Sequence, residues 1–177
     1  MDRKPSVERM VRDSGMLRHL GIEFSDLSPE RVVATMPVDD RHLQPPGLLH
    51  GGMSVALAKS VAAAGAWLNC PPGKVALGSS VNASYIRSKG VGSRLWAVGI
   101  PEFVGPDKQL WEVDVRDEAG DWVCALRCTL SVVDVDGNFL PKLTDPGRSI
   151  LNVSASRIPL CRIRGRPRRW SPRRAFG

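Results

Sequence analysis

Apolar and polar residues recur along this chain with two different periods. Residues 6–20 place apolar side chains from Val7 to Leu20 at roughly helical spacing, which predicts a short amphipathic helix that Ser6 caps and Gly15 weakens. Residues 21–38 alternate around a Ser-Pro turn instead, which predicts two antiparallel strands. The N-terminal part of the chain therefore reads as a helix followed by a hairpin.

Residues 51–68 are apolar on nearly every helical face, which predicts a helix buried on all sides. Four further segments alternate or carry strand-forming residues between short connectors rich in Gly, Pro or Asp, and we expect them to form an antiparallel meander. These predicted strands are residues 75–87, 94–104, 109–117 and 122–135. The order of elements predicts an α+β protein in which a curved antiparallel sheet wraps a central helix, the hotdog architecture.

The chain divides by pattern into a helix at residues 1–20, one globular domain at residues 21–145 and a tail at residues 146–177. Eight arginines and no acidic residue lie between Arg157 and Gly177, and without them the basic and acidic residues of the chain would nearly balance. This Arg/Pro-rich tail predicts disorder. It is either a solvated extension or a contact for an anionic partner, and the second alternative predicts salt-sensitive binding.

The four cysteines form no pattern typical of a metal site, so we expect reduced thiols, no bound metal and a cytoplasmic protein. No apolar segment is long enough to predict a membrane span.

The run QPPGLLHGG at residues 44–52 stands directly before the apolar helix. Free N–H groups and the positive end of the helix dipole favour a negative oxygen there, and glycines allow a ligand to approach the backbone. The oxygen of a thioester carbonyl under attack fits such a place. Gly51 or Gly52 would supply the N–H donor, Gln44 a side-chain amide, and His50 either a ligand contact or a structural hydrogen bond.

This run, the helix after it and the segment NASYIR at residues 82–87 together resemble the hotdog-fold acyl-CoA thioesterases. The resemblance covers residues 21–134 and is closest to the phenylacetate-pathway and 1,4-dihydroxy-2-naphthoyl-CoA thioesterase branch. It implies that a homodimer, or a homotetramer, builds each site from two chains, and that CoA enters as part of the substrate with no separate cofactor.

The same resemblance implies individual roles for matching residues. Gln44 and the backbone N–H of Gly51 would hold the thioester carbonyl, and His50 falls on the histidine of the motif. Asn82 falls on the asparagine of the family's strand signature, and Arg87 on a basic position beside the CoA phosphates.

Lys59 departs from the family, which carries a catalytic Glu or Asp at this position, and Ala63 replaces a frequent Ser or Thr one turn later. An ammonium with a pKa near its reference value of about 10.4 accepts no proton. Lys59 is therefore a buried neutral amine that acts as base or nucleophile, or a cation that binds an oxyanion or a substrate carboxylate while Asp39, Asp40 or a partner residue helps water attack. Alternatively, it pairs with a buried acid, or the site binds without turnover.

The sequence thus predicts an acyl-CoA thioesterase-like hydrolase. The alternative is a non-catalytic acyl-CoA binding or sensing protein of the same fold.

Overall fold

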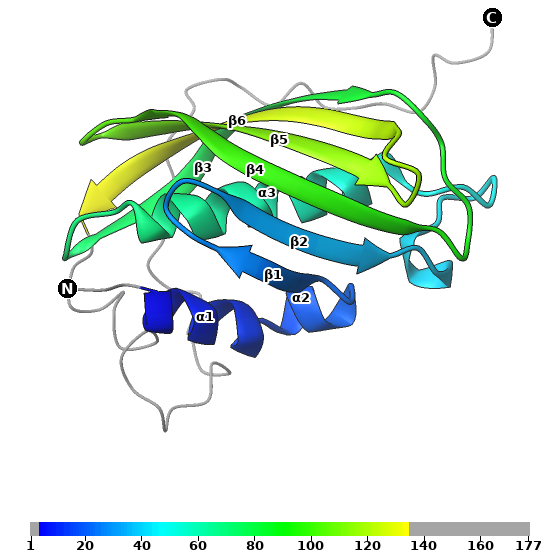
Figure 1. Cartoon of the computed structure of the whole chain (residues 1–177), viewed down its shortest axis with the longest axis horizontal. Coiled ribbons are helices and arrows are strands. Elements are labelled where there is room, and N and C mark those ends of the chain that lie inside the picture. The colour runs from blue at the N-terminus through cyan, green and yellow to red at the C-terminus, as the bar shows by residue number, and fades with distance from the viewer. Residues whose placement is uncertain (1–3, 135–177) are drawn as a thin grey trace, which may run out of the picture. The chain divides into compact units, whose positions relative to one another are not determined.

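Residues 4–134 are described by the structure, a computed structural model (Figure 1). They form a six-stranded antiparallel sheet in the order β1-β2-β4-β5-β6-β3, with helices on one side. The strands are β1 (Glu23–Leu27), β2 (Val32–Pro37), β3 (Lys74–Tyr85), β4 (Arg94–Val104), β5 (Lys108–Asp117) and β6 (Trp122–Asp134). The helices are α1 (Lys4–Asp13), α2 (Gly15–His19), the short 3-10 helix η1 (Asp40–His42) and α3 (Gly51–Leu68).

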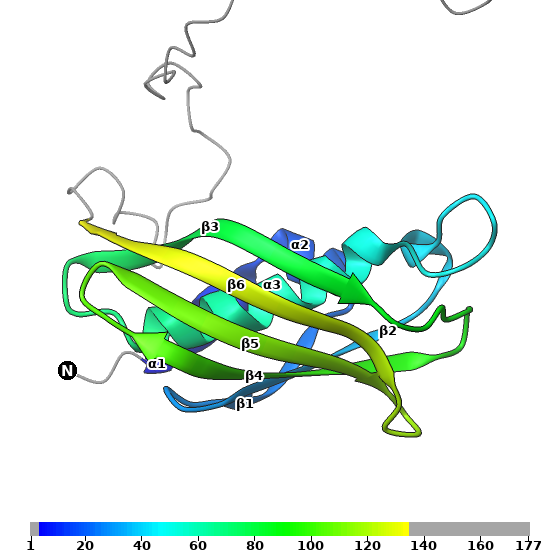
Figure 2. The ribbon, with the colours of Figure 1, turned by 90° about the horizontal axis from the view of Figure 1, so that it is seen from above.

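The sheet curves around α3, which lies against its concave face (Figures 1 and 2). Helix and sheet are in close contact where Gly65 of α3 meets the buried indole ring of Trp111 on β5. The Trp111 Nε1–H donates to Gln109 Oε1 at 3.1 Å, and Gln109 Nε2 donates to the carbonyl of Ala66 at 3.0 Å. The predicted α+β hotdog architecture is confirmed.

The predicted four-stranded meander is wrong, because β3 does not pair with β4. Strand β3 instead pairs with β6 along its length, from Lys74↔Asp134 to Tyr85↔Cys124, and only β4, β5 and β6 form a meander. Residues 86–93 do not form a hairpin. They run from β3 at one edge of the sheet past the ends of β6 and β5 to the inner strand β4. The alternation of apolar residues shows which face a side chain takes but does not show which strand lies beside it.

The N-terminal helix is present as two helices rather than one. Its break falls at Ser14, whose hydroxyl accepts a hydrogen bond from Leu17 N–H and caps α2, rather than at Gly15. Ser6 lies inside α1 and is not its N-cap.

Helix α3 is not buried on every side in the single chain, since Lys59 is exposed. Strand β3 is also exposed along most of its length, although apolar residues such as Val81 occupy it. One edge of β3 pairs with β6, and the other has no strand beside it among residues 4–134. The side of α3 that carries Lys59, which the pattern predicts to be buried, therefore faces outward, as does most of β3.

Candidate active site

A tight hairpin places the QPPGLLHGG run at the start of α3. Gln44 N–H donates to the carbonyl of Leu48 at 2.8 Å, and His50 N–H donates to that of His42 at 2.8 Å. Gly47 closes the turn with a φ of +80°, a conformation that glycine adopts without steric cost. Gln44 is therefore held on the hairpin that leads into α3.

His50 is the N-cap of α3, and its Nδ1 accepts a hydrogen bond from Gly52 N–H at 2.9 Å. Of the two alternatives for this side chain, the structural hydrogen bond is present. Because Nδ1 accepts, the ring proton resides on Nε2, which leaves a donor on an exposed side chain.

The cap leaves Gly51 as the available donor at the helix N-terminus. Gly52 N–H is taken by His50, and Met53 N–H donates to the carbonyl of His50 at 2.8 Å. Within residues 4–134, the N–H of Gly51 has no hydrogen-bond acceptor. Of the two glycines, Gly51 is thus the one whose N–H has no acceptor among the described residues.

Tyr85 covers this donor, and sequence reasoning missed it. A Cβ atom on Gly51 would lie 2.7 Å from Cε1 of the tyrosine ring, so a side chain at position 51 would require this ring to move. Tyr85 is 62% exposed, at the end of β3. The alternation of side chains along β3 could have identified Tyr85, because it puts Tyr85 on the helix-facing side of the strand with Val81 and Ala83.

Lys59 lies on the same helix as Gly51 but far along it. The two positions are eight residues apart, which corresponds to about 12 Å along the helix axis. The Lys59 side chain is exposed, and its Cε lies so close to Gly78 of β3 that a Cβ atom there would come within 2.9 Å. Among the described residues, no carboxylate forms an ion pair with it.

Two of the predicted alternatives for Lys59 require a buried side chain or a buried acidic partner. Neither condition is met within the described single chain, and Lys59 and Gly51 do not share one site there. Ala63 follows Lys59 by one helical turn and packs, partly buried, against the core.

Asn82 and Arg87 lie in different surroundings. Asn82 is exposed directly opposite Arg127 of β6, on the face of the sheet that points away from α3. Arg87 follows the end of β3, where its Nη1 lies 3.4 Å from the carboxylate of Asp121 and donates to the carbonyl of Trp122 at 3.4 Å. Gln44 and His50 lie on one hairpin and Gly51 begins the helix that follows it, whereas Lys59, Asn82 and Arg87 lie on other parts of the fold.

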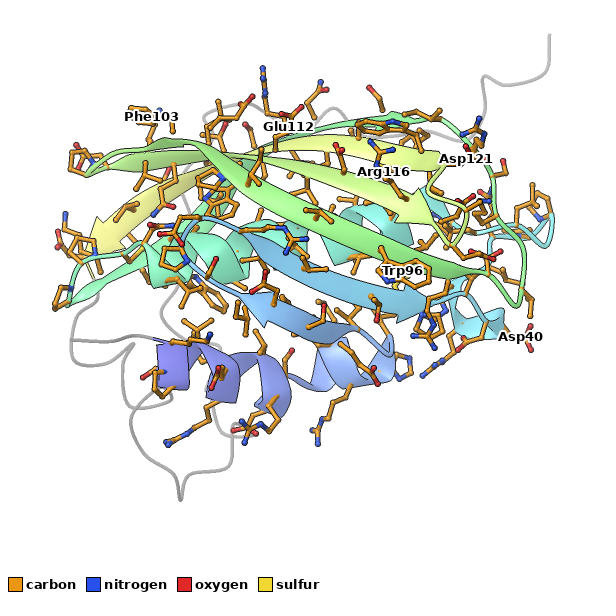
Figure 3. The ribbon with its side chains drawn as sticks, in the orientation of Figure 1. Asp40, Trp96, Phe103, Glu112, Arg116 and Asp121 are labelled. Carbon is orange, nitrogen blue, oxygen red and sulfur yellow. The ribbon has the colours of Figure 1, made fainter. Side chains whose placement is uncertain are left out.

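The two acids predicted to help water attack lie before the motif hairpin. Asp39 binds Arg41 at 2.6 Å, and this contact holds the pKa of the Asp39 carboxyl well below its ordinary value of 3.8. Asp40 is exposed on η1, near the end of the molecule where α3 begins (Figure 3). Asp39 is therefore committed to Arg41, and both acids lie outside the hairpin that carries Gln44.

A buried ion pair anchors the motif hairpin to the rest of the fold. Lys89 donates to Asp117, whose side chain is 3% exposed, and this hydrogen bond lowers the pKa of the Asp117 carboxyl. The backbone carbonyl of Lys89 accepts from Leu49 N–H at 2.7 Å, directly before His50. Asp117 also accepts from the backbone N–H groups of Ala119 and Asp121 in the β5–β6 turn.

Three connecting segments therefore meet at one end of the molecule: residues 43–50, residues 86–93 and the β5–β6 turn (Figures 1 and 2). Figure 3 shows Asp121 at this end and Phe103 at the opposite one. In the part of the chain that the structure describes, no group of three or more potential ligands is arranged to hold a metal ion. No helix of residues 4–134 is long and apolar enough to cross a bilayer.

A helix N-terminus with a free N–H, set in a sheet that wraps the helix, defines the hotdog class of thioester-binding proteins. The family model described as "Thioesterase superfamily" matches residues 46–124. The chain is 35% identical over 133 residues to the 1,4-dihydroxy-2-naphthoyl-CoA hydrolase of Escherichia coli, covering 74% of this chain and 97% of that protein. It is 37% identical over 118 residues to the proofreading thioesterase EntH of Cronobacter turicensis, covering 67% and 85%.

A solved thioesterase structure from Haemophilus influenzae matches with a TM-score of 0.66 and 38% identity, over 71% of this chain and 87% of that one. The chain belongs to the thioesterase superfamily.

Proposed function

We propose that this protein hydrolyses acyl-CoA thioesters at a site built between two copies of the chain. The observation that carries the proposal is the free N–H of Gly51 at the positive end of α3. A thioester carbonyl oxygen would accept from this N–H, while the Gln44 amide and the Nε2–H of His50 lie on the same hairpin as further donors.

The exposed edge of β3 supports a site shared by two copies. An open strand edge with apolar residues favours pairing with a second chain, and paired identical chains are most often related by a two-fold axis. Antiparallel pairing of two β3 strands about an axis near Val81 would bring Gly78 of one copy close to Tyr85 of the other. Since Lys59 contacts Gly78 and Tyr85 contacts Gly51, Lys59 would then approach the Gly51 donor of the second copy.

The proposed reaction uses water as the nucleophile. Water adds to the thioester carbonyl carbon, and the oxyanion that forms is held by Gly51 N–H and by the side-chain amide of Gln44. Collapse of this adduct breaks the C–S bond, releases CoA as its thiolate and leaves the acid, while the proton from water passes to solvent. Because Lys59 cannot act as a carboxylate base, we expect slow turnover.

A second candidate is an acyl-CoA binding protein without turnover, which the replacement of the family acid by Lys59 favours. The two candidates separate in a thiol-release assay on short, long and aromatic acyl-CoAs. Wild type is compared with Lys59→Glu, and Lys108→Glu serves as a charge-matched control on β5. The signal is corrected for the protein's own thiols, of which Cys70, Cys124 and Cys128 are buried.

Release of CoA by wild type above background, not improved by Lys59→Glu, supports hydrolysis with a lysine in the site. A silent wild type together with an active Lys59→Glu variant would replace the hydrolase proposal with the binding protein.

A further inference from the structure

Lys59 is the one charged residue of α3, and nothing in the described structure neutralises it. Its ammonium is exposed beside the helix-facing side of β3, and no carboxylate among residues 4–134 forms an ion pair with it. Gly78 lies opposite, where an added Cβ atom would come within 2.9 Å of the lysine Cε. The side chain therefore lies flat across β3, with its charge available.

The segments that would form the site contain no carboxylate at all. The sequence has no Asp or Glu between Asp40 and Glu102, an interval that includes the motif hairpin, α3, β3 and residues 86–93. A second copy that contributes the same segments would bring no acid either. Of the acids at the motif end, Asp39 is engaged with Arg41, Asp117 with Lys89 and Asp121 with Arg87, while Asp40 is exposed on η1.

Closing such a site over a ligand excludes water, and an ammonium left without a partner there costs free energy. A neutral acyl group would leave the Lys59 charge unpaired, whereas a carboxylate on the acyl group would form a charge-assisted hydrogen bond with it. The cation would thus discriminate between acyl groups that have similar apolar surface.

We propose that Lys59 selects acyl groups that carry a negative charge, with a carboxylate as the preferred group. This inference rests on the proposed function, since it assumes that acyl-CoA binds in the site that includes Gly51. It assigns to Lys59 a role in specificity, and the acyl carboxylate would lie between α3 and β3, near Gly78 and the buried Cys128.

The surroundings of Cys128 support this placement. Burial raises the pKa of the Cys128 thiol, while the positive charge of Lys59 acts in the opposite direction on the same thiol. The positive charge of Lys59 therefore acts on the helix-facing side of β6 as well as beside β3. A carboxylate held there would meet the ammonium and the apolar side of α3.

The test measures binding separately from turnover, with non-hydrolysable thioether analogues of hexanoyl-CoA and adipoyl-CoA. The two ligands have the same chain length and differ in the terminal carboxylate. Calorimetric titration gives both dissociation constants for wild type, Lys59→Met and Lys59→Arg, with Lys108→Met as a control for loss of a lysine elsewhere. Analogues of butyryl-CoA and succinyl-CoA repeat the comparison for a shorter chain.

We expect wild type to bind at least one carboxylate analogue about tenfold or more tightly than its neutral match, the effect of one hydrogen bond to a charged group. This ratio should fall to near one in Lys59→Met and persist in Lys59→Arg and Lys108→Met. Equal binding of both members of each pair by wild type, or a preference that survives in Lys59→Met, would overturn the inference.

Failure of the proposed function looks different. If no analogue binds and no acyl-CoA is hydrolysed, both proposals fall. If neutral analogues bind and neutral acyl-CoAs are hydrolysed without any preference for carboxylates, only the role of Lys59 in specificity is wrong.

Discussion

Gly65 of α3 lies against the indole ring of Trp111 so closely that a Cβ atom at Gly65 would come within 2.1 Å of the ring. The indole is fully buried and its N–H is already bonded to Gln109, so the ring has little freedom to move. Helix and sheet are in direct contact at this point.

Gly65→Ala should therefore lower the free energy of unfolding by about 2 kcal/mol or more, as overpacked core positions do. Urea denaturation followed by tryptophan fluorescence measures the change. Gly15→Ala is the matched control, because its Cβ would meet nothing within 4 Å. Equal stability of Gly65→Ala and wild type would show that the helix can shift away from the ring.

His50→Ala should reduce both stability and hydrolysis, because it removes the acceptor that caps α3. Loss of an N-cap costs about 1 kcal/mol, and Gly52 N–H loses its partner. His50→Asn retains an acceptor of cap type and should recover most of the stability. If Asn also restores hydrolysis in full, the Nε2–H of His50 has no part in holding the thioester.

The Asp117 carboxylate should make stability depend on acid pH. Its pKa in the folded protein is lowered from the ordinary value of 3.8 by the hydrogen bond from Lys89. The pair therefore stabilises the folded protein above that value, and the stabilisation is lost as the pH falls through the lower, folded-state pKa.

Denaturation measured from about pH 7 to about pH 2 should show a smaller acid-dependent loss for Asp117→Asn than for wild type. Glu112→Gln controls for removal of an acid in general, since Glu112 is exposed and forms no ion pair within residues 4–134. The same acid-dependent loss in Asp117→Asn and wild type would contradict the stabilising role of the Lys89 contact.

Val81→Lys should convert the protein to monomers and abolish activity, because it places a charge in the middle of the free edge of β3. Val81 is 39% exposed in the single chain, so the substitution disturbs no buried core. Light scattering coupled to size exclusion gives the mass. Met16→Lys, at another exposed apolar residue, should keep the wild-type mass, and a monomeric wild type would refute the shared site.

Arg87→Gln should raise KM for acyl-CoA about tenfold, through loss of a charge-assisted contact with a phosphate. KM for the matching N-acetylcysteamine thioester, which lacks the nucleotide, should stay close to that of wild type. Asp121→Asn should act in the opposite direction, because Asp121 competes with phosphate for Arg87. Equal changes for both thioesters would remove Arg87 from CoA binding.

The sequence predicts the elements well because each is recorded in a local pattern. The apolar run of α3 and the alternation of the strands mark where they lie, and the motif hairpin places Gln44, His50 and Gly51 together. Contacts between residues that are far apart in the sequence have no such local pattern. The pairing of β3 with β6, the contact of Tyr85 with Gly51 and the Lys89–Asp117 ion pair all depend on how the chain folds back on itself.

Lys59 shows the same limit in the site. The motif predicts that the lysine and Gly51 act together, but residues eight positions apart on one helix lie about 12 Å apart along its axis. The spacing within the motif therefore identifies both residues. It does not show that Lys59 and Gly51 of the same chain lie too far apart to act in one site.

The contact between Lys59 and Gly78 favours glycine at position 78 without requiring it. A Cβ atom there would come within 2.9 Å of the lysine Cε, near the far end of a flexible, exposed side chain that can move away. A larger residue at position 78 would therefore shift the lysine charge rather than exclude it.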